Sequence, residues 1–389
     1  MWRSLASNAL TLFIVALLGV AGLVGWGEKT YSGPGPLTQA VCVRVDKGAS
    51  VASISKVLLA QGAISNGTIF RLGAQYSGQP EGLKFGSYLV HPGASMADIF
   101  DTLTKGGQSS CGTEVNFRIG VTDAQIVVRT LDPTTEAFVE VAKFDPGADP
   151  VPAAYTDAEK VPDTRYRVTL AEGVTSFQVV DSLKKVDFLT GDVAKQPDEG
   201  SLAPESYELT RGEPRVQLIG EMQARQAATL AELWAGRAAG LPYKTPGEAL
   251  VMASLVEKET GVPEERPEVA SVFLNRLAQG IKLQTDPAVI YGITKGQGTL
   301  GRGLRQSELR ANNPYNTYVI DGLPPGPIAN PGRASIEAAL HPADTKYLYF
   351  VADGTGGHAF AETLAEHNRN VAKWRAIEAA QGIAPDAGN

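Results

Sequence analysis

Two glutamates flank a lysine in the segment SLVEKETGV, residues 254–262, which closes an apolar run. A glutamic acid that stays protonated near neutral pH can act as a general acid on a glycosidic oxygen. The same carboxylates could also be structural groups, satisfied by an arginine or by backbone N–H groups. The spacing of the neighbouring apolar residues indicates which of the two is unusual.

A helical wheel separates the two glutamates. At about 100° per residue, Glu259 continues the apolar stripe, whose other members are Ala249, Met252, Ala253 and Val256. Glu257 falls beside Ser254 and Lys258 and is predicted to be a solvated edge carboxylate. Partial burial and the negative end of the helix dipole would both raise the pKa of Glu259. Glu259 is therefore the candidate acid, with the structural reading still open.

Polar, aromatic and turn-forming residues are concentrated downstream, above all in LQTDPAVIYG (283–292) and NNPYNTYVIDGLPPGPIANPG (312–332). Such a mixture suits a sugar polymer, whose rings stack on aromatic side chains and whose hydroxyl and N-acetyl groups bond to amides. Each residue alone could instead serve a turn or a helix cap. Only the cluster as a whole indicates a binding site.

The ordered motifs VEKET, FLNRL, LQTDPAVIYG, YNTYVIDGLPPGPIANPG, YLYFVADGTGGHAF and EHN resemble the MltG/YceG-like family of endolytic murein transglycosylases. The resemblance covers residues 241–370 closely and residues 41–106 more loosely. It implies a single-pass inner-membrane enzyme that cuts nascent peptidoglycan glycan strands internally, with peptidoglycan synthases as partners and no metal or cofactor.

The family's catalytic glutamate lies in the E-K-E-T motif and is carried over to Glu259, which a hydroxyl residue, Thr260, follows directly. The resemblance also implies a set of substrate-binding positions, which are Gln284, Thr285, Asp286, Tyr315, Asn316, Thr317 and Asn330. In the implied reaction, Glu259 protonates the oxygen between N-acetylmuramic acid and N-acetylglucosamine. The muramyl 6-hydroxyl then closes a 1,6-anhydro ring, without water.

Two other functions stay open. Hydrolytic glycosidases use two carboxylates, so a hydrolytic muramidase would employ Asp286 as its base. A non-catalytic peptidoglycan-binding scaffold would instead rely on the N-terminal module. The motif GQGTLG (296–301) fits a nucleotide-binding pattern, but no long strand precedes it, and it is interpreted as loop glycine. His341, His358 and His367 show no metal-ligand spacing, and structural or cleft roles are expected for them.

The N-terminal segment predicts a membrane anchor. Residues 5–26 carry no charge and would span about 33 Å as a helix, enough to cross a bilayer. Arg3 precedes this segment, so the N-terminus is predicted to be cytoplasmic and the remainder periplasmic. A signal peptide cleaved after Ala21 is the alternative.

The composition limits which classes of protein this chain can belong to. The 389 residues include 42 Asp and Glu against 35 Lys and Arg, for a net charge of -7, which argues against a nucleic-acid partner. Apolar residues make up 43% of the chain, enough for real cores. The two cysteines, Cys42 and Cys111, could form a disulfide in an oxidising compartment or remain two buried thiols.

The predicted fold class is α+β: a transmembrane helix, a small LysM-like α+β module and a mixed α+β catalytic domain. The expected segments are 1–27 (cytoplasmic stub and anchor), 28–37 (linker), 38–112 (LysM-like module), 113–205 (connecting region), 206–375 (catalytic domain) and 376–389 (flexible tail). Residues 120–164 are expected to be an inserted segment of the connecting region, and their part 145–163, rich in Pro, Asp and Ala, is expected to be a loop or partly ordered.

Overall fold

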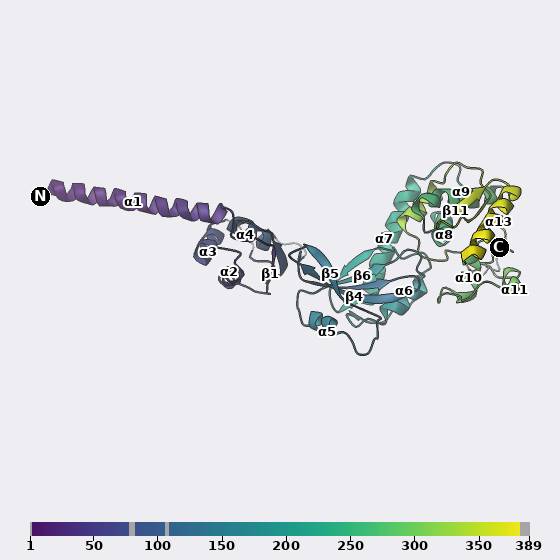
Figure 1. The fold of residues 1–389 in the computed structure, drawn as a ribbon, viewed down its shortest axis with the longest axis horizontal. Coiled ribbons are helices and arrows are strands. Elements are labelled where there is room, and N and C mark those ends of the chain that lie inside the picture. Colours follow the sequence, from purple (N-terminus) through teal and green to yellow (C-terminus); the bar gives the residue numbers. More distant parts are fainter. Residues whose placement is uncertain (1, 78–81, 106–108, 382–389) are drawn as a thin grey trace. The chain divides into compact units, whose positions relative to one another are not determined.

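The computed structural model describes residues 2–77, 82–105 and 109–381. The chain divides into two compact units. The first comprises Met1–Val115, Val127–Lys143 and Pro150–Arg165, and the second comprises Asn116–Ile126, Phe144–Asp149 and Tyr166–Asn389. Helices and strands occur in both, as the predicted α+β class requires (Figure 1).

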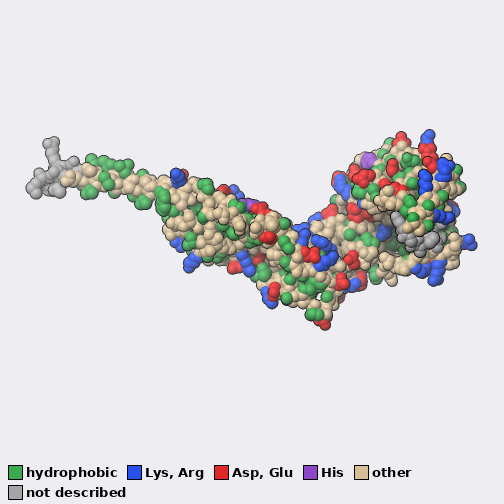
Figure 2. All heavy atoms as spheres, in the orientation of Figure 1, with side chains coloured by type: hydrophobic (Ala, Val, Ile, Leu, Met, Phe, Trp, Pro, Cys, Tyr) green, Lys and Arg blue, Asp and Glu red, His purple; other side chains and the backbone are tan. Residues whose placement is uncertain are grey.

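The first helix, α1 (Trp2–Ser32), is long and apolar. Its part Asn8–Ser32 is long and apolar enough to cross a membrane, and the most apolar 18-residue window within it is not buried inside the protein. Figure 2 shows hydrophobic side chains along this helix, and Leu12, Leu18 and Leu23 are each at least two-thirds exposed. Apolar side chains exposed along a whole helix need a non-aqueous environment, which agrees with the predicted membrane segment.

A small α+β module follows, made of β1 (Val41–Val45), α2 (Val51–Ala60), α3 (Gly67–Tyr76), β2 (Gly86–Val90) and α4 (Met96–Lys105). The two strands are antiparallel, with Val41 opposite Val90 and Val45 opposite Gly86. The apolar faces of the helices and strands meet in one core that includes Leu58, Phe70 and Phe100.

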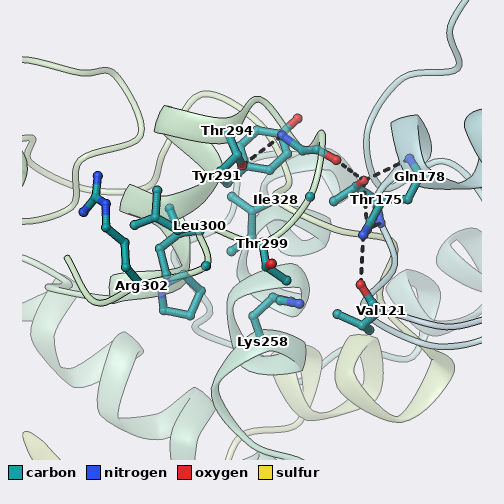
Figure 3. A pocket seen from close by; sticks show the side chains of 15 residues that line it. Val121, Thr175, Gln178, Lys258, Tyr291, Thr294, Thr299, Leu300, Arg302 and Ile328 are labelled. Carbon is teal, nitrogen blue, oxygen red and sulfur yellow. Dashed lines mark hydrogen bonds between the residues drawn. The ribbon is translucent and has the colours of Figure 1, made fainter. Parts of the chain in front are cut away.

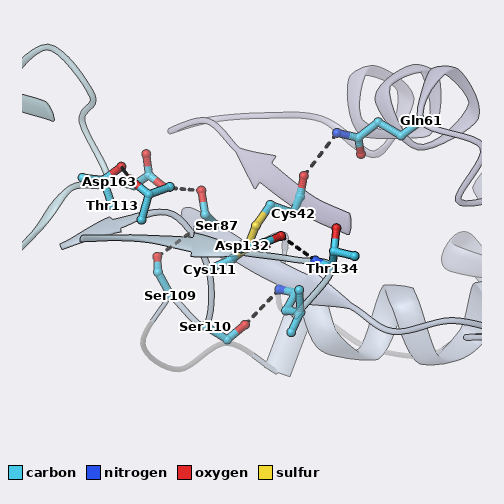
Figure 4. The surroundings of a disulfide bond; sticks show 12 residues. Cys42, Gln61, Ser87, Ser109, Ser110, Cys111, Thr113, Asp132, Thr134 and Asp163 are labelled. Atoms are coloured by element: carbon cyan, nitrogen blue, oxygen red, sulfur yellow. Dashed lines mark hydrogen bonds between the residues drawn. A yellow bond between two sulfur atoms is a disulfide. The ribbon is translucent and has the colours of Figure 1, made fainter. Parts of the chain in front are cut away.

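A disulfide joins Cys42 in β1 to Cys111, with their Cα atoms 5.9 Å apart. Figure 4 shows the bridge and the bond from Gln61 Nε2 to the Cys42 carbonyl, 3.1 Å long. The bridge closes a stretch of 69 residues that contains most of the module. Of the two open alternatives, the structure has the disulfide.

A five-stranded sheet has the order β5-β4-β3-β6-β8. Its strands are β3 (Thr113–Ile119), β4 (Ala124–Asp132), β5 (Ala137–Phe144), β6 (Arg165–Leu170) and β8 (Ser206–Leu209). The part 145–163 was expected to be a loop or partly ordered, but it contains helix α5 (Ala153–Glu159), and the rest of 120–164 contributes β4 and β5. Four buried residues, Ile126, Val127, Val128 and Leu131, anchor β4 in the sheet.

The second unit contributes helix α6 (Ser176–Leu183), the short parallel pair β7 (Leu189–Thr190) and β9 (Glu213–Pro214), and the long helix α7 (Arg215–Ala235). Helix α7 ends at Ala235. Gly236 caps it, donating to the carbonyls of Leu233 and Trp234.

Helices then dominate the second unit: α8 (Pro246–Glu259), the 3-10 turn η1 (Pro263–Glu265), α9 (Arg266–Ala278), α10 (Asp286–Thr294), α11 (Gln306–Leu309) and α12 (Arg333–Leu340). An antiparallel hairpin, β10 (Tyr349–Ala352) and β11 (His358–Ala361), and helix α13 (Leu364–Gln381) complete it. Helix α8 packs against α7, α9, α10 and α12 and forms the centre of the core.

The predicted flexible tail, 376–389, begins inside α13, which continues to Gln381. Residues 376–381 are therefore helical, and the rest of the predicted tail, 382–389, lies outside the described residues.

Candidate active site

Glu259 is the last residue of α8, and its side chain faces an open pocket. Thr245 caps the start of the helix, where its hydroxyl accepts from the Glu248 N–H, and Thr260, whose backbone is extended, caps the end. The pocket has a volume of about 440 Å³. Its lining residues are Glu259, Arg276, Leu283, Gln284, Asp286, Tyr318, Tyr349, Phe350, Val351, Ala352, His358, Leu364 and His367.

The surroundings of Glu259 raise its pKa to about 7. Burial is the largest cause, because it disfavours the carboxylate, and the nearby charge of Asp286 acts in the same direction. The Thr285 hydroxyl and the charges of His358 and Arg276 act in the opposite direction without cancelling the effect. Glu259 can therefore be protonated near neutral pH while keeping partial solvent access through the pocket.

The second carboxylate of the pocket, Asp286, is the first residue of α10. The Tyr318 hydroxyl donates a 2.6 Å hydrogen bond to Asp286 Oδ1. Burial first, and this bond second, raise the pKa of Tyr318, so the phenol stays a donor. Asp286 thus shares the pocket with Glu259 but is already engaged by a neighbour.

The turn before α10 brings Gln284 and Thr285 to the site. Gln284 has a positive φ of 52° and an exposed side chain in the pocket. Thr317 holds this turn: its carbonyl accepts from Gln284 N (3.1 Å), and its hydroxyl accepts from Thr285 N (2.9 Å) and donates to the Thr285 carbonyl (3.1 Å). The buried Thr285 hydroxyl has no hydrogen-bond partner of standard geometry among the described residues. The Thr285 hydroxyl lowers the pKa of Glu259, so it lies close to the Glu259 carboxyl.

Two asparagines expected at the binding surface are fully buried. Asn316 Nδ2 donates to the carbonyls of Glu308, Leu309 and Ala311, at 3.1, 3.2 and 2.8 Å. Asn330 Nδ2 donates to the Val174 carbonyl at 2.9 Å. Both side chains have no exposed area, so they hold loops together and have no surface to offer a sugar.

The remaining expected binding residues also lie away from the pocket surface. Thr317 is fully buried. Tyr315 is half-buried and packs against Tyr291, with ring centroids 4.9 Å apart. Of the seven expected binding positions, only Gln284 and Asp286 line the pocket that contains Glu259.

Glu257 is not the solvated carboxylate that the wheel predicted. Its side chain is only 6% exposed, it accepts from the Gly332 N–H at 3.0 Å, and it lies 3.9 Å from Arg266 Nη2. The wheel failed because α8 has no polar face: every residue from Val251 to Val256 is buried, Ser254 included. Glu257 therefore has the structural role that was left open for Glu259.

Several pocket residues were not predicted as site residues. Arg276 of α9 is buried and donates to the carbonyls of Leu348 (2.6 Å) and Leu283 (2.8 Å), and its charge lowers the pKa of Glu259. His358 in β11 and His367 in α13 both line the pocket. Their motifs, FLNRL, GGHAF and EHN, were noticed in the sequence, but their convergence needs the folded chain.

A second pocket of about 310 Å³ opens beside Lys258, the residue before Glu259 (Figure 3). The Lys258 ammonium donates to the Gly173 carbonyl at 3.3 Å, and burial lowers its pKa. The glycine loop 296–301 forms part of the wall, and the Thr175 hydroxyl bonds to the Gly296 carbonyl. The loop thus has a structural place at the rim of a pocket, and the last turn of α8 reaches two pockets through adjacent residues.

Comparison with known proteins identifies the relatives of this chain. It is 31% identical over 340 residues to an endolytic murein transglycosylase of Bacillus subtilis, covering 86% of this chain and 84% of that protein. It is 30% identical over 341 residues to an endolytic murein transglycosylase of Streptococcus pneumoniae, and it spans 58% of that longer protein. A solved structure of a YceG-like protein from Listeria monocytogenes is 26% identical, with a TM-score of 0.46, and the match covers 85% of this chain and 98% of that chain.

The sequence profile of the YceG-like family matches residues 43–373, which include both the N-terminal module and the pocket. This span far exceeds half of the 389 residues. The chain belongs to the YceG-like family.

Proposed function

We propose that this protein is an endolytic peptidoglycan lytic transglycosylase, with Glu259 as its catalytic acid and base. The observation that carries the proposal is a single glutamic acid, with a pKa raised to about 7, at the wall of an open pocket. A general acid with a pKa near the working pH is well suited to protonate a leaving oxygen. The family and the names of its relatives support peptidoglycan as the substrate.

In the proposed reaction, Glu259 donates its proton to the oxygen between N-acetylmuramic acid and N-acetylglucosamine. The bond from that oxygen to muramyl C1 breaks, and the leaving sugar takes the electron pair. The resulting carboxylate then receives the proton of the muramyl 6-hydroxyl, whose oxygen bonds to C1 as a 1,6-anhydro ring. One carboxylate suffices because no water has to be activated, and Glu259 ends the cycle protonated again.

Gln284 and Asp286 are the proposed substrate contacts, since both line the pocket beside Glu259. Thr285 would act through its hydroxyl on Glu259. Thr317, Asn316 and Asn330 would support the site by holding its loops. An endo-acting enzyme must hold sugars on both sides of the cut, and the pocket beside Lys258 offers further binding surface.

The proposal extends to the rest of the chain. The module of residues 38–112 would be a LysM-like part that binds the glycan strand, which its strand–helix–helix–strand core supports. Helix α1 would be an uncleaved anchor in the inner membrane, with its N-terminus cytoplasmic because Arg3 precedes the apolar run. Such an enzyme would meet nascent strands next to the peptidoglycan synthases, which would be its partners.

A hydrolytic muramidase is the second candidate, because Asp286 lies in the same pocket as Glu259 and could serve as a base for water. The distinction depends on the products. Lytic cleavage leaves 1,6-anhydro-muramyl ends, whereas hydrolysis leaves reducing ends.

The test is a digest of purified peptidoglycan by the full chain in detergent, with the products identified by mass spectrometry. We expect anhydromuramyl ends from the parent protein and a loss of at least about 10³-fold with Glu259→Gln, which removes the acid and leaves the shape unchanged. Glu248→Gln, on the same helix and outside the pocket, is the control and should keep full activity. Reducing ends would favour the muramidase, and unchanged digestion by Glu259→Gln would exclude Glu259 as the acid.

A further inference from the structure

A second titratable pair lies next to Glu259 and has no part in the reaction as proposed above. The Glu265 carboxylate accepts hydrogen bonds from His358 N (2.7 Å) and from the Thr260 hydroxyl (3.0 Å), and it lies 2.7 Å from His358 Nδ1. Although burial acts in the opposite direction, these bonds hold the pKa of Glu265 below its ordinary value. Glu265 is therefore an anion.

Three separate segments are folded together to make this pair. Thr260 caps α8 directly after Glu259, Glu265 closes the turn η1, and His358 begins β11. A Cβ on residue 357 would displace the Glu265 carboxylate from its present place, because Gly357 packs directly against Glu265 Oε1. Such close packing fixes both partners, with side chains 14% exposed for Glu265 and 18% for His358.

The pairing determines which imidazole nitrogen carries the proton. An ionised carboxylate only accepts hydrogen bonds, so His358 Nδ1 must donate to Glu265. In the neutral ring, Nε2 is then left with its lone pair available as an acceptor. No described residue bonds to Nε2, and the ring is held edge-on against Phe350, with centroids 5.2 Å apart.

The orientation matters because His358 lines the same pocket as Glu259. A carboxylate–imidazole pair beside a reacting hydroxyl is the arrangement that removes a hydroxyl proton in serine hydrolases. The lytic reaction also has a reacting hydroxyl, the 6-hydroxyl of the muramyl residue. It must lose its proton as it bonds to C1.

We propose that His358, oriented by Glu265, is a second catalytic residue that accepts the muramyl 6-hydroxyl proton at Nε2 and relays it to the Glu259 carboxylate. This inference rests on the proposed lytic function. The O6–H bond breaks, its electron pair forms the bond to C1, and the proton goes to Nε2. Glu259, which has just given its own proton to the leaving sugar, receives this proton from the imidazolium. No outside acid, base or water is consumed. Glu265 is a positioning residue.

The test compares substitutions of His358 in the full chain in detergent, digesting purified peptidoglycan, with products separated by mass spectrometry. Asparagine places an amide N–H where the imidazole has Nδ1, so His358→Asn can keep the bond to Glu265 while losing Nε2. We expect His358→Asn to cut turnover by about 10²-fold or more. We also expect the fraction of reducing ends to rise, because water can capture C1 when the 6-hydroxyl is not activated. The product ratio does not depend on how much of the variant is folded.

Glu265→Gln separates positioning from catalysis. It keeps a similar shape but no longer fixes the tautomer of His358, and we expect a loss of about 10-fold with a smaller shift in the products. His341→Asn, an exposed histidine at the end of α12 and outside the pocket, is the matched control and should change neither rate nor products.

The outcomes separate this inference from the proposed function. If the parent makes no anhydromuramyl ends, the lytic function itself fails. If the parent makes them and His358→Asn keeps both the rate and the product ratio, then only the role of His358 is overturned. A His358→Asn protein that is slower but makes anhydromuramyl ends alone would give the residue a structural role and would also overturn the relay.

Discussion

At the residue scale, Glu257 and Glu259 show how environment decides what a carboxylate can do. Glu257 accepts a hydrogen bond from the Gly332 N–H and lies near Arg266, so its buried carboxyl has partners. At Glu259 the Thr285 hydroxyl and the charges of His358 and Arg276 do not offset burial, which keeps the carboxyl protonated near neutral pH. The second arrangement costs folding free energy, which is common at catalytic sites.

This cost predicts that the stability and the activity of the parent both fall as the pH rises through the pKa of Glu259. The pKa of Glu259 is raised from 4.5 to about 7 on folding, so the folded chain binds more protons and loses stability as the pH rises through this range. At pH 8 we therefore expect Glu259→Gln to be more stable than the parent by up to about 3 kcal/mol, with little difference at pH 4. Over the same range, parental activity should fall above about pH 7 as the acid ionises. Melting curves and rates between pH 4 and 9 test both effects, and a variant less stable than the parent at pH 8 would contradict the burial argument.

At the element scale, the turn before α10 is the part of the site most constrained by its backbone. Gln284 adopts a left-handed conformation, which costs a non-glycine residue about 1 kcal/mol. The turn nevertheless keeps its place, because the backbone of both Gln284 and Thr285 bonds to Thr317. A strained residue with an exposed side chain in the pocket is a candidate for substrate contact.

Replacing Gln284 by glycine should separate the backbone strain at this position from the contact of its side chain with the substrate. Glycine adopts a positive φ freely, so we expect Gln284→Gly to be more stable by about 1 kcal/mol. We also expect activity to drop about 10-fold, because the amide no longer reaches the glycan. Lys295→Gly is the matched control: Lys295 also has a positive φ, of 56°, caps the other end of α10 and lies outside the pocket. It should gain similar stability and keep full activity. Equal activities of the two variants would remove Gln284 from the binding surface.

At the scale of the whole molecule, the chain has two compact units with separate chemistry. One contains the disulfide, the small α+β module and the apolar helix α1, and the other contains Glu259 and every residue of its pocket. The disulfide restricts the unfolded chain over 69 residues, which corresponds to about 4 kcal/mol in the chain-entropy treatment.

Removing the disulfide should therefore affect one unit. In calorimetry of the full chain in detergent, we expect the double variant Cys42→Ser, Cys111→Ser to lower the melting transition of the unit that held the bridge. The transition of the unit that contains Glu259 should stay within about 1 °C, because the bridge restrains none of that unit. Reduction of the parent by dithiothreitol should reproduce the shift. Equal shifts in both transitions would show that the units unfold together.

The sequence by itself determined the local features of this protein. The uncharged run before Glu28, the alternating valines of β1, the amphipathic spacing of α4 and the glutamate that ends α8 all follow from neighbouring residues. Helix and strand periodicity are local properties, so the fold class, the apolar helix and Glu259 as the unusual carboxylate were predictable. The ordered motifs also identified the family.

Only the tertiary structure decided which polar residues reach the pocket. Asn316 and Asn330 look like binding residues in the sequence, but both are buried in the folded chain: Asn316 donates to nearby loop carbonyls, and Asn330 donates to the Val174 carbonyl, 156 residues away. Glu257 was misread for the same reason, since the burial of a helix on all sides depends on what packs against it. Glu265 and His358 lie 93 residues apart, and no local pattern joins them. Burial and hydrogen-bond partners are long-range properties, and they decide whether a polar side chain supports the fold or remains available for chemistry.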